Sequence, residues 1–160
     1  MIVLLITVFC YIFTYQFRYS FTNEPCRAHF PAKAVGTALD RAWMNVYPIP
    51  CPYLSGDWKI AGQASLYMKG RPSVLCYYHG LGPDNHPDGF WCSDEDVKRE
   101  GGIIVWKAGD GVPPDDIPEY LARRFPTAQV RPDHLTVPWQ TPAKNLPPLK
   151  LRFAIVPPSR

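Results

Sequence analysis

The first seventeen residues, MIVLLITVFCYIFTYQF, form an apolar run with no formal side-chain charge, and Arg18 ends it. Hydrocarbon has no water to satisfy backbone polar groups, so such a run is stable there as a helix. A bilayer core needs roughly 17–25 helical residues, which places this run at the short end. Tyr11, Tyr15 and Tyr19 gather at its far end, where aromatic rings favour the headgroup region. We therefore expect a transmembrane helix over residues 1–17.

Two alternatives to a membrane helix stay open. A cleaved signal peptide would want a basic segment at its start and a small-residue cleavage site, and the sequence has neither. A helix buried in the protein core is the other alternative, because an apolar run of this length also suits a large core. The sequence favours the membrane helix over both.

The rest of the chain has the composition of one folded domain. Roughly 140 residues follow the apolar run, which is enough for a sizeable core. Five tryptophans and nine tyrosines argue against disorder. The net charge of +3 is spread along the chain, and its only basic doublets are Lys98-Arg99 and Arg123-Arg124, so no nucleic-acid partner is expected. We predict a juxtamembrane link over 18–30 and a soluble domain over 31–160.

Helical and strand patterns alternate through this domain. Apolar residues at helical spacing from Val35 predict a first helix, which Gly36 weakens. Ser55-Gly56 reads as a turn, after which Asp57 is placed to cap a helix, and Ser93 is placed to cap another whose first turn is acidic. The expected helices lie near residues 31–45, 58–68, 94–100 and 116–125, and the expected strands near 51–54, 73–77, 103–107, 128–130 and 149–156.

This alternation predicts the fold class α/β, a small layered sheet with helices packed on it, preceded by one N-terminal transmembrane helix. The continuous apolar run GIIVW is typical of an inner, parallel strand. LKLRFAIV alternates apolar and polar residues, which favours a half-buried edge or antiparallel strand. The residues expected in one common core are Val74, Leu75, Ile103, Ile104, Val105, Leu121, Phe153 and Ile155.

Cysteine chemistry leaves several interpretations open. Outside the apolar run the four cysteines are Cys26, Cys51, Cys76 and Cys92. They permit two disulfides in an oxidising compartment, with Cys76–Cys92 as one candidate pair, or buried thiols in a reducing one. Cys76, His79, His86 and Cys92 are also competent zinc ligands, but their spacing matches no common zinc finger, so no metal site is predicted.

Motifs for catalysis are missing from the sequence. It contains no G-x-G-x-x-G opening a helix after a strand, no G-x-S-x-G elbow, no P-loop and no H-E-x-x-H. The carboxylates of Asp57, Asp94 and Glu95 are sufficiently explained as helix caps and first-turn acids. We assign no catalytic residue and expect no cofactor.

A series of short motifs carries a family resemblance over roughly residues 53–158. The motif residues are Gly56-Asp57-Trp58, Ala61-Gly62, Leu66-Tyr67, Arg71-Pro72-Ser73-Val74, Trp91, Gly101, Val105-Trp106 and Ile155-Val156-Pro157-Pro158. Their order and spacing resemble the C-terminal extracytoplasmic domain of bacterial family-39-type glycosyltransferases, multi-spanning relatives of protein mannosyltransferases and of the lipid A aminoarabinose transferase. The cysteines and histidines above do not belong to that family pattern, which further weakens the zinc hypothesis.

The resemblance implies an enzyme that transfers sugar from a polyprenyl-phosphate donor on the outer face of the cytoplasmic membrane. Its catalytic aspartate lies in an early extracytoplasmic loop, for which this chain has no counterpart. The chain then corresponds to the last membrane helix and terminal domain, as a fragment, a misplaced start or a split partner. Its expected partners are membrane lipid and, through the missing transmembrane portion, the polyprenyl-phosphate-linked sugar. The alternative is a single-pass, membrane-anchored α/β binding module without catalytic activity.

The family resemblance also implies a bacterial cytoplasmic-membrane location with the domain on the periplasmic, extracytoplasmic face. A lone helix followed by Arg18 and Arg27 would instead leave the domain in the cytoplasm by the positive-inside tendency. In a multi-spanning protein, upstream helices would set the orientation. We expect the domain outside.

The loop from His79 to Trp91 is the expected contact surface of the domain. It joins the end of a predicted strand to the start of a helix, and ligands of open α/β sheets gather at the carboxyl ends of strands. The candidate acceptor or sugar contacts are His79, Asp84, His86, Asp88 and Trp91. A plain surface connection, ordered only by a Cys76–Cys92 bridge, is the alternative that the frequency of such connectors favours.

Overall fold

The structure is a computed structural model that describes residues 6–11, 29–77, 92–109, 119–132, 134–140 and 146–159. The chain divides into two compact units. One unit comprises Met1–Pro31 and Pro138–Pro148, and the other comprises Ala32–Val137 and Leu149–Arg160. The predicted domain boundary near residue 30 stays a prediction.

In the first unit, residues 6–11 are helical and their side chains are exposed. The remainder of the expected span over 1–17 lies outside the described residues. Among the residues that are described, no helix has the length and apolarity needed to cross a membrane. The same unit holds a small aromatic contact, in which the rings of Phe30 and Trp139 meet edge-on at 6.5 Å between centroids. The transmembrane helix stays a prediction.

The second unit is a mixed α/β fold, as the sequence predicted. Its helices are α2 (Ala32–Met44), α3 (Trp58–Ser65), α4 (Asp94–Glu100) and α5 (Glu119–Arg124). Its strands are β1 (Tyr53–Asp57), β2 (Ser73–Tyr77), β3 (Gly102–Lys107), β4 (Gln129–Val130), β5 (Leu135–Val137) and β6 (Leu149–Val156). They form a six-stranded sheet of order β2-β1-β3-β6-β4, and β5 pairs with β6.

The first three strands along the chain are parallel to one another. β1 pairs with β2 on one side and with β3 on the other, both in parallel, which confirms the prediction for GIIVW. β6 is antiparallel to β3, as expected for LKLRFAIV. It is not an edge strand, however, because β4 and β5 both pair with its far side. The expected half-burial is also wrong, since every residue of β6 except Lys150 is buried.

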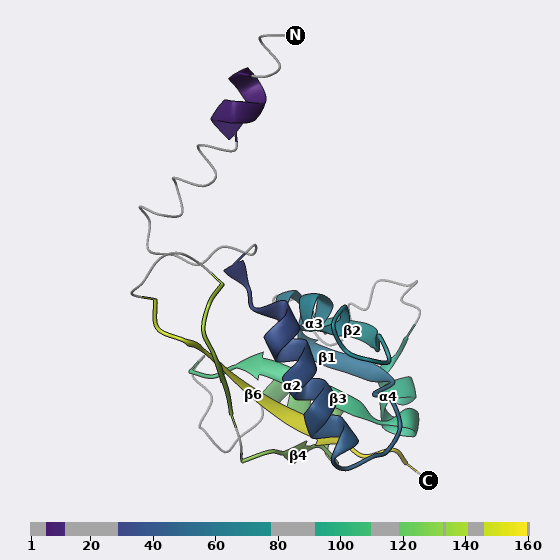
Figure 1. Cartoon of the computed structure of the whole chain (residues 1–160). Helices are drawn as coiled ribbons and strands as arrows, with labels where there is room; N and C mark the ends of the chain where they lie inside the picture. Colours follow the sequence, from purple (N-terminus) through teal and green to yellow (C-terminus); the bar gives the residue numbers. More distant parts are fainter. Residues whose placement is uncertain are drawn as a thin grey trace. The chain divides into compact units, whose positions relative to one another are not determined.

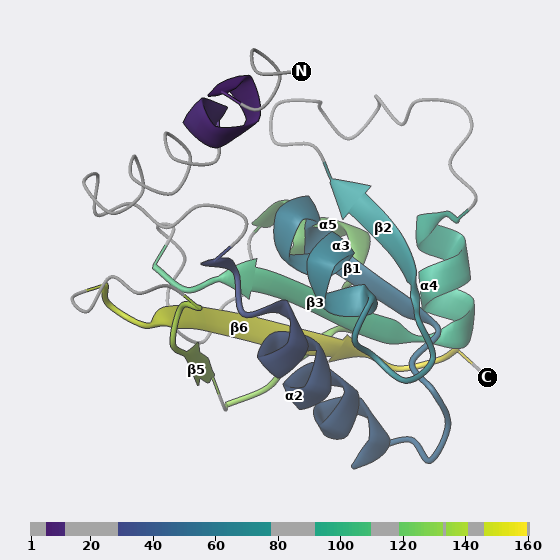
Figure 2. The same cartoon turned by 45° about the horizontal axis from the view of Figure 1, so that its top comes forward.

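Helices cover both faces of the sheet. Crossovers between parallel strands are right-handed. The connection from β1 to β2 and the connection from β2 to β3 run in opposite directions across the sheet, so their helices lie on opposite faces. Accordingly α3, together with α2, lies on one face and α4 on the other (Figures 1 and 2). This double coverage explains why β6 is buried on both of its faces.

The core is therefore divided by the sheet rather than continuous as expected. One cluster lies under α4 and α5 and comprises Leu75, Cys92, Val97, Ile104, Trp106, Leu121, Phe125, Ala154 and Val156. The register pairs Ile103–Ile155 and Val105–Phe153 occupy the alternate strand positions, so they are buried on the opposite face. Val74 is only half-buried, contrary to expectation.

Two local predictions on either side of Asp57 are wrong. Ser55 and Gly56 belong to β1 instead of forming a turn, and the Ser55 hydroxyl donates to the Leu75 carbonyl at 3.1 Å. The following helix ends at Ser65, where the backbone N–H of Leu66 turns back to Ala64, so it does not continue to residue 68. The predicted start of the last helix, residues 116–118, lies outside the described residues.

Gly36 has a packing role that its low helix propensity conceals. A Cβ atom at this position would lie 2.4 Å from the Ala64 carbonyl oxygen and 3.0 Å from Tyr67 Cβ. Because these distances are too short for any side chain, glycine is what allows α2 to approach α3 so closely. The residue that weakened the prediction of α2 thus determines how α2 packs.

Candidate functional site

The carboxyl ends of the three parallel strands meet at one edge of the sheet. β1 ends at Asp57 and β2 ends at Tyr77, and these two residues are register partners. β3 ends at Lys107. The connection that leaves β1 leads to α3 on one face of the sheet, and the connection that leaves β2 leads to α4 on the other face. The direction of the crossovers therefore reverses between these two strands. In open α/β sheets ligands bind outside the carboxyl ends at such a switch point, which makes this edge the candidate site.

The described side chains at this edge are suited to binding rather than to proton transfer. The Asp57 carboxylate accepts backbone N–H bonds from Lys59 at 2.8 Å and Ile60 at 3.3 Å, which confirms its predicted capping role. The Lys59 ammonium lies 5.7 Å from the centroid of the Trp58 ring. Lys107 is exposed at the end of β3. An indole face and two cations can contact a sugar ring or an anionic group.

The predicted contact residues cannot be placed at this edge directly. His79, Asp84, His86, Asp88 and Trp91 all lie outside the described residues, and their contact role stays a prediction. The residues that flank them are described. β2 ends at the carboxyl edge, and α4 begins after Ser93. Tyr77, the last described residue before the predicted contacts, therefore lies beside Asp57.

The cysteine predictions are resolved only in part. Cys51 is a buried free thiol, which agrees with the buried-thiol interpretation. Cys92 is buried, with its Sγ atom 3.7 Å from the Val74 carbonyl oxygen. The Cys76 side chain lies outside the described part of the structure, so the Cys76–Cys92 pairing stays a prediction. Within the described residues, no three His, Cys, Asp or Glu side chains are grouped so that they could hold a metal ion.

Burial makes the Cys51 thiol a poor nucleophile. Its removal from water raises the pKa of Cys51 from 9.0 to about 12. The thiolate is the reactive form, so we expect Cys51 to resist iodoacetamide at pH 9 in the native protein and to react once guanidinium unfolds the chain. Peptide mass spectrometry measures the labelled fraction. Equal labelling of Cys51 in the native and unfolded states would contradict this burial.

The raised pKa of Cys51 also makes the free energy of unfolding depend on pH. Between pH 9 and 12 the unfolded chain loses the Cys51 proton before the folded chain does, so the free energy of unfolding falls as the pH rises. In a Cys51→Ala variant this contribution is absent. The stability difference between wild type and variant is therefore expected to narrow above pH 9, as measured by urea unfolding at a series of pH values.

Arg152 is a buried charged residue that the sequence analysis missed. Its side chain is 6% exposed, and its register partner is Trp106, near the carboxyl end of β3. The alternating interpretation of LKLRFAIV assigned it to solvent. The continuous apolar run from Phe153 to Val156 could have indicated the burial of Arg152, because such a run is typical of a strand covered on both faces.

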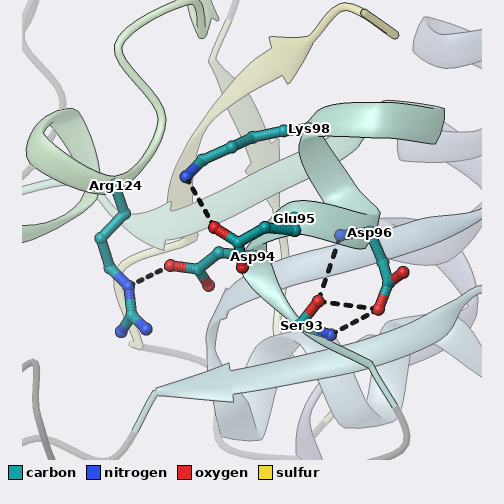
Figure 3. Close-up of polar contacts among 6 residues, drawn as sticks. All are labelled: Ser93, Asp94, Glu95, Asp96, Lys98 and Arg124. Atoms are coloured by element: carbon teal, nitrogen blue, oxygen red, sulfur yellow. Dashed lines mark hydrogen bonds and ion pairs between the residues drawn. The ribbon is translucent and has the colours of Figure 1, made fainter.

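Polar residues at the start of α4 stabilise the helix and attach it to α5. Ser93 and Asp96 form a capping box, in which the Ser93 hydroxyl accepts from the Asp96 backbone and the Asp96 carboxylate accepts from the Ser93 backbone at 2.9 Å (Figure 3). Hydrogen bonds from the Ser93 backbone, the Ser93 side chain and Arg99 lower the pKa of Asp96. Asp94 forms an ion pair with Arg124 at 2.5 Å. These acidic residues therefore have structural partners.

Removing the cap should weaken α4 measurably. We expect Ser93→Ala to lower the free energy of unfolding by about 1 kcal/mol at pH 7, because the Asp96 backbone N–H loses its partner. Since the pKa of Asp96 lies below its ordinary value of 3.8, the part of the cap that its carboxylate supplies is present above that pH and is lost as the pH falls through the lowered pKa. Urea unfolding at pH 7 and below pH 3.8 measures both effects. A cost that does not change with pH would contradict the role of the Asp96 carboxylate.

The Arg123-Arg124 doublet is engaged in ion pairs. Arg123 pairs with Glu119 on the exposed side of α5, and Arg124 pairs with Asp94 of α4. Both arginines thus have local acidic partners.

Comparison with known proteins gives no match, whether with family models, curated proteins or solved structures.

Proposed function

We propose that this chain is the C-terminal part of a membrane-integral glycosyltransferase that transfers a sugar from a polyprenyl-phosphate donor to an extracytoplasmic acceptor. The chain itself lacks the catalytic loop and supplies a domain that helps to position the substrates. The observation that carries this proposal is that the family-like motifs, which are far apart in the sequence, contact one another in the fold.

The closest of these contacts joins the Gly56-Asp57-Trp58 motif to the Val105-Trp106 motif. Gly56 of Gly56-Asp57-Trp58 is the register partner of Val105 of Val105-Trp106. A Cβ atom on Gly56 would lie 2.0 Å from the Val105 carbonyl oxygen. The two motifs are thus mutually dependent, because only glycine in the first allows the second to pair so closely. This dependence supports the interpretation that the motifs together define one fold.

The closing motif makes a similar contact. Gly101 has a φ of +82°, and a Cβ atom there would lie 2.9 Å from the Val156 carbonyl oxygen and 3.0 Å from Pro158. The Gly101 motif and the Ile155-Val156-Pro157-Pro158 motif therefore pack against each other. This pattern supports a shared fold with the resembling domains.

The carboxyl edge of the parallel strands fits the role of a substrate-positioning surface. Trp58 offers a ring for stacking, and Lys59 and Lys107 carry the positive charges that a phosphate-linked donor attracts. The Asp57 carboxylate is engaged in capping α3. Catalysis is therefore expected from the transmembrane portion, with contacts from this edge.

The coding sequence upstream of Met1 tests this proposal at little cost. An in-frame region that encodes a series of hydrophobic helices, with an acidic residue in an early loop, supports the enzyme. A stop codon directly upstream, with no neighbouring gene for such a membrane protein, contradicts it and favours the single-pass binding module.

A further inference from the structure

Exposed large apolar side chains gather in one region of the α/β unit. Among the described residues of Ala32–Val137 and Leu149–Arg160, the exposed large hydrophobic residues are Met44, Val46, Ile49, Leu66 and Tyr67. Leu66 is 66% exposed and Ile49 is 52% exposed. Met44 is the last residue of α2, and the other four residues follow the ends of α2 and α3. We call these five residues the α2–α3 patch. Such a concentration of exposed apolar residues marks an interaction surface.

Several contacts show that the two segments of the patch are neighbours. Tyr67 lies against Gly36 of α2. The backbone N–H of Lys69 donates to the Asp40 carboxylate at 3.3 Å. Gly70 lies against Pro50, and the Trp43 indole N–H donates to the Ile49 carbonyl at 2.9 Å. The turn after α3 is therefore fixed beside both α2 and the segment that follows it.

The charges around the patch have one predominant sign. Arg41, Lys69 and Arg71 are exposed beside it. The single carboxylate among these neighbours is Asp40, which is half-buried and accepts the Lys69 N–H. Three cations against one carboxylate leave a net charge of +2 around an apolar surface. An apolar patch with a positively charged border complements a partner that has an apolar interior and a negatively charged surface.

We propose that the α2–α3 patch rests on the surface of a lipid bilayer containing anionic phospholipids. Leucine, isoleucine and tyrosine side chains enter the boundary between headgroups and acyl chains, while lysine and arginine contact the phosphates. Each basic side chain near an anionic membrane strengthens the attachment. The inference rests on the membrane-anchoring part of the proposed function, because an anchor holds the domain close enough for such weak contacts to persist.

The described part of the N-terminal run supports the same partner. The remaining exposed large hydrophobic residues of the chain that the structure describes are Ile6, Val8, Phe9 and Tyr11, all on the helical segment 6–11. The chain therefore has two apolar surfaces of the kind that a bilayer covers. The domain patch differs from the N-terminal run in having a basic border, which predicts that its contact depends on anionic lipid.

Photocrosslinking from the lipid tests this inference on the full chain. The wild-type chain is reconstituted into vesicles of phosphatidylcholine, with or without phosphatidylglycerol, that contain a diazirine-bearing phospholipid. Crosslinked residues are mapped by mass spectrometry. We expect crosslinks in residues 44–49 and 66–71 in the phosphatidylglycerol vesicles, at least about fivefold fewer in phosphatidylcholine alone, and none on α4.

Charge reversal supplies matched variants. Lys69→Glu with Arg71→Glu should reduce the patch crosslinks at least about fivefold while leaving those of residues 1–17 unchanged. Arg123→Glu with Lys150→Glu makes the same change in net charge on α5 and β6 and should leave the patch crosslinks at the wild-type level. An equal loss with both pairs of variants would contradict a specific role for the patch.

The outcomes separate this inference from the proposed function. No lipid crosslinks in either residues 1–17 or the patch would overturn the membrane anchor and the inference with it. Crosslinks in residues 1–17 without any in the patch would overturn the inference alone. Crosslinks between two copies of the patch that increase with the protein-to-lipid ratio would also overturn it, in favour of self-association.

Discussion

Replacing Gly56 with alanine is expected to destabilise the α/β unit by at least about 4 kcal/mol. Gly56 has a φ of +110°, a conformation that side-chain-bearing residues rarely adopt. A Cβ atom there would also lie 2.0 Å from the Val105 carbonyl oxygen and 2.9 Å from the Val105 backbone nitrogen. The neighbouring atoms are backbone of the adjacent central strand, so β1 and β3 must separate to admit the methyl group.

Gly62→Ala is the matched control for this variant. Gly62 lies in α3, only six residues further along the chain, and a Cβ atom there would meet nothing within 4 Å. We expect Gly62→Ala to stabilise the protein by up to about 1 kcal/mol, because alanine is the better helix former. Thermal and urea unfolding measure both changes. If Gly56→Ala yields only unfolded protein, that result also agrees with the prediction. Wild-type stability in Gly56→Ala would contradict the close pairing of β1 and β3.

Truncating Arg124 is expected to cost about 3 kcal/mol. The Arg124 and Asp94 side chains are only 17% and 12% exposed, and their atoms approach to 2.5 Å. Removing one partner of a largely buried pair leaves the other charge poorly solvated, which is costly. The pair joins α5 to α4, so Arg124→Ala should also weaken the packing of Leu121 and Phe125 in the cluster beneath.

Arg123→Ala is the control, because it removes the neighbouring arginine of the same helix. Arg123 and Glu119 are 76% and 79% exposed, so this loss should change stability by no more than about 0.5 kcal/mol. In a double-mutant cycle, Asp94→Ala and Arg124→Ala together should cost clearly less than the sum of the two single changes. Additive costs would show that the Asp94–Arg124 contact contributes nothing of its own.

Sequence signals that act locally predicted the corresponding structure well. The Ser93 cap and its acidic first turn fixed the start of α4, and Asp57 fixed the start of α3. The apolar run of β3 predicted an inner parallel strand correctly, because the run itself reports burial on both faces. These predictions depended only on residues within a few positions of one another.

Features that depend on distant partners were not predictable in the same way. Ser55 and Gly56 have turn-forming composition, yet pairing with β2 and β3 holds them in a strand. Arg152 alternates with apolar neighbours, yet it is only 6% exposed in β6, a strand buried along almost its whole length. β5 is three residues long in a proline-rich region and has no local strand signal. In each case tertiary context overrides local propensity.

The strand ends predicted a site at the carboxyl edge of the sheet, where β1, β2 and β3 end, and a site at this edge stays a prediction. The predicted contacts were confined to residues 79–91. Trp58, Lys59 and Lys107, which the structure describes at this edge, were not predicted. Trp58 and Lys59 looked like ordinary helix residues, because nothing in the sequence reveals that α3 begins directly at the end of β1.

Sugar transfer in membranes tests the central claim most directly. Membranes that contain the product of the complete coding region are supplied with a radiolabelled polyprenyl-phosphate sugar and an acceptor fraction, alongside membranes that contain this chain alone. The proposal predicts transfer by the complete product and by its Gly62→Ala variant, loss of transfer in its Gly56→Ala variant, and no transfer by this chain alone. Sustained transfer by this chain alone would contradict the claim that catalysis lies outside it, as would full activity in the Gly56→Ala variant.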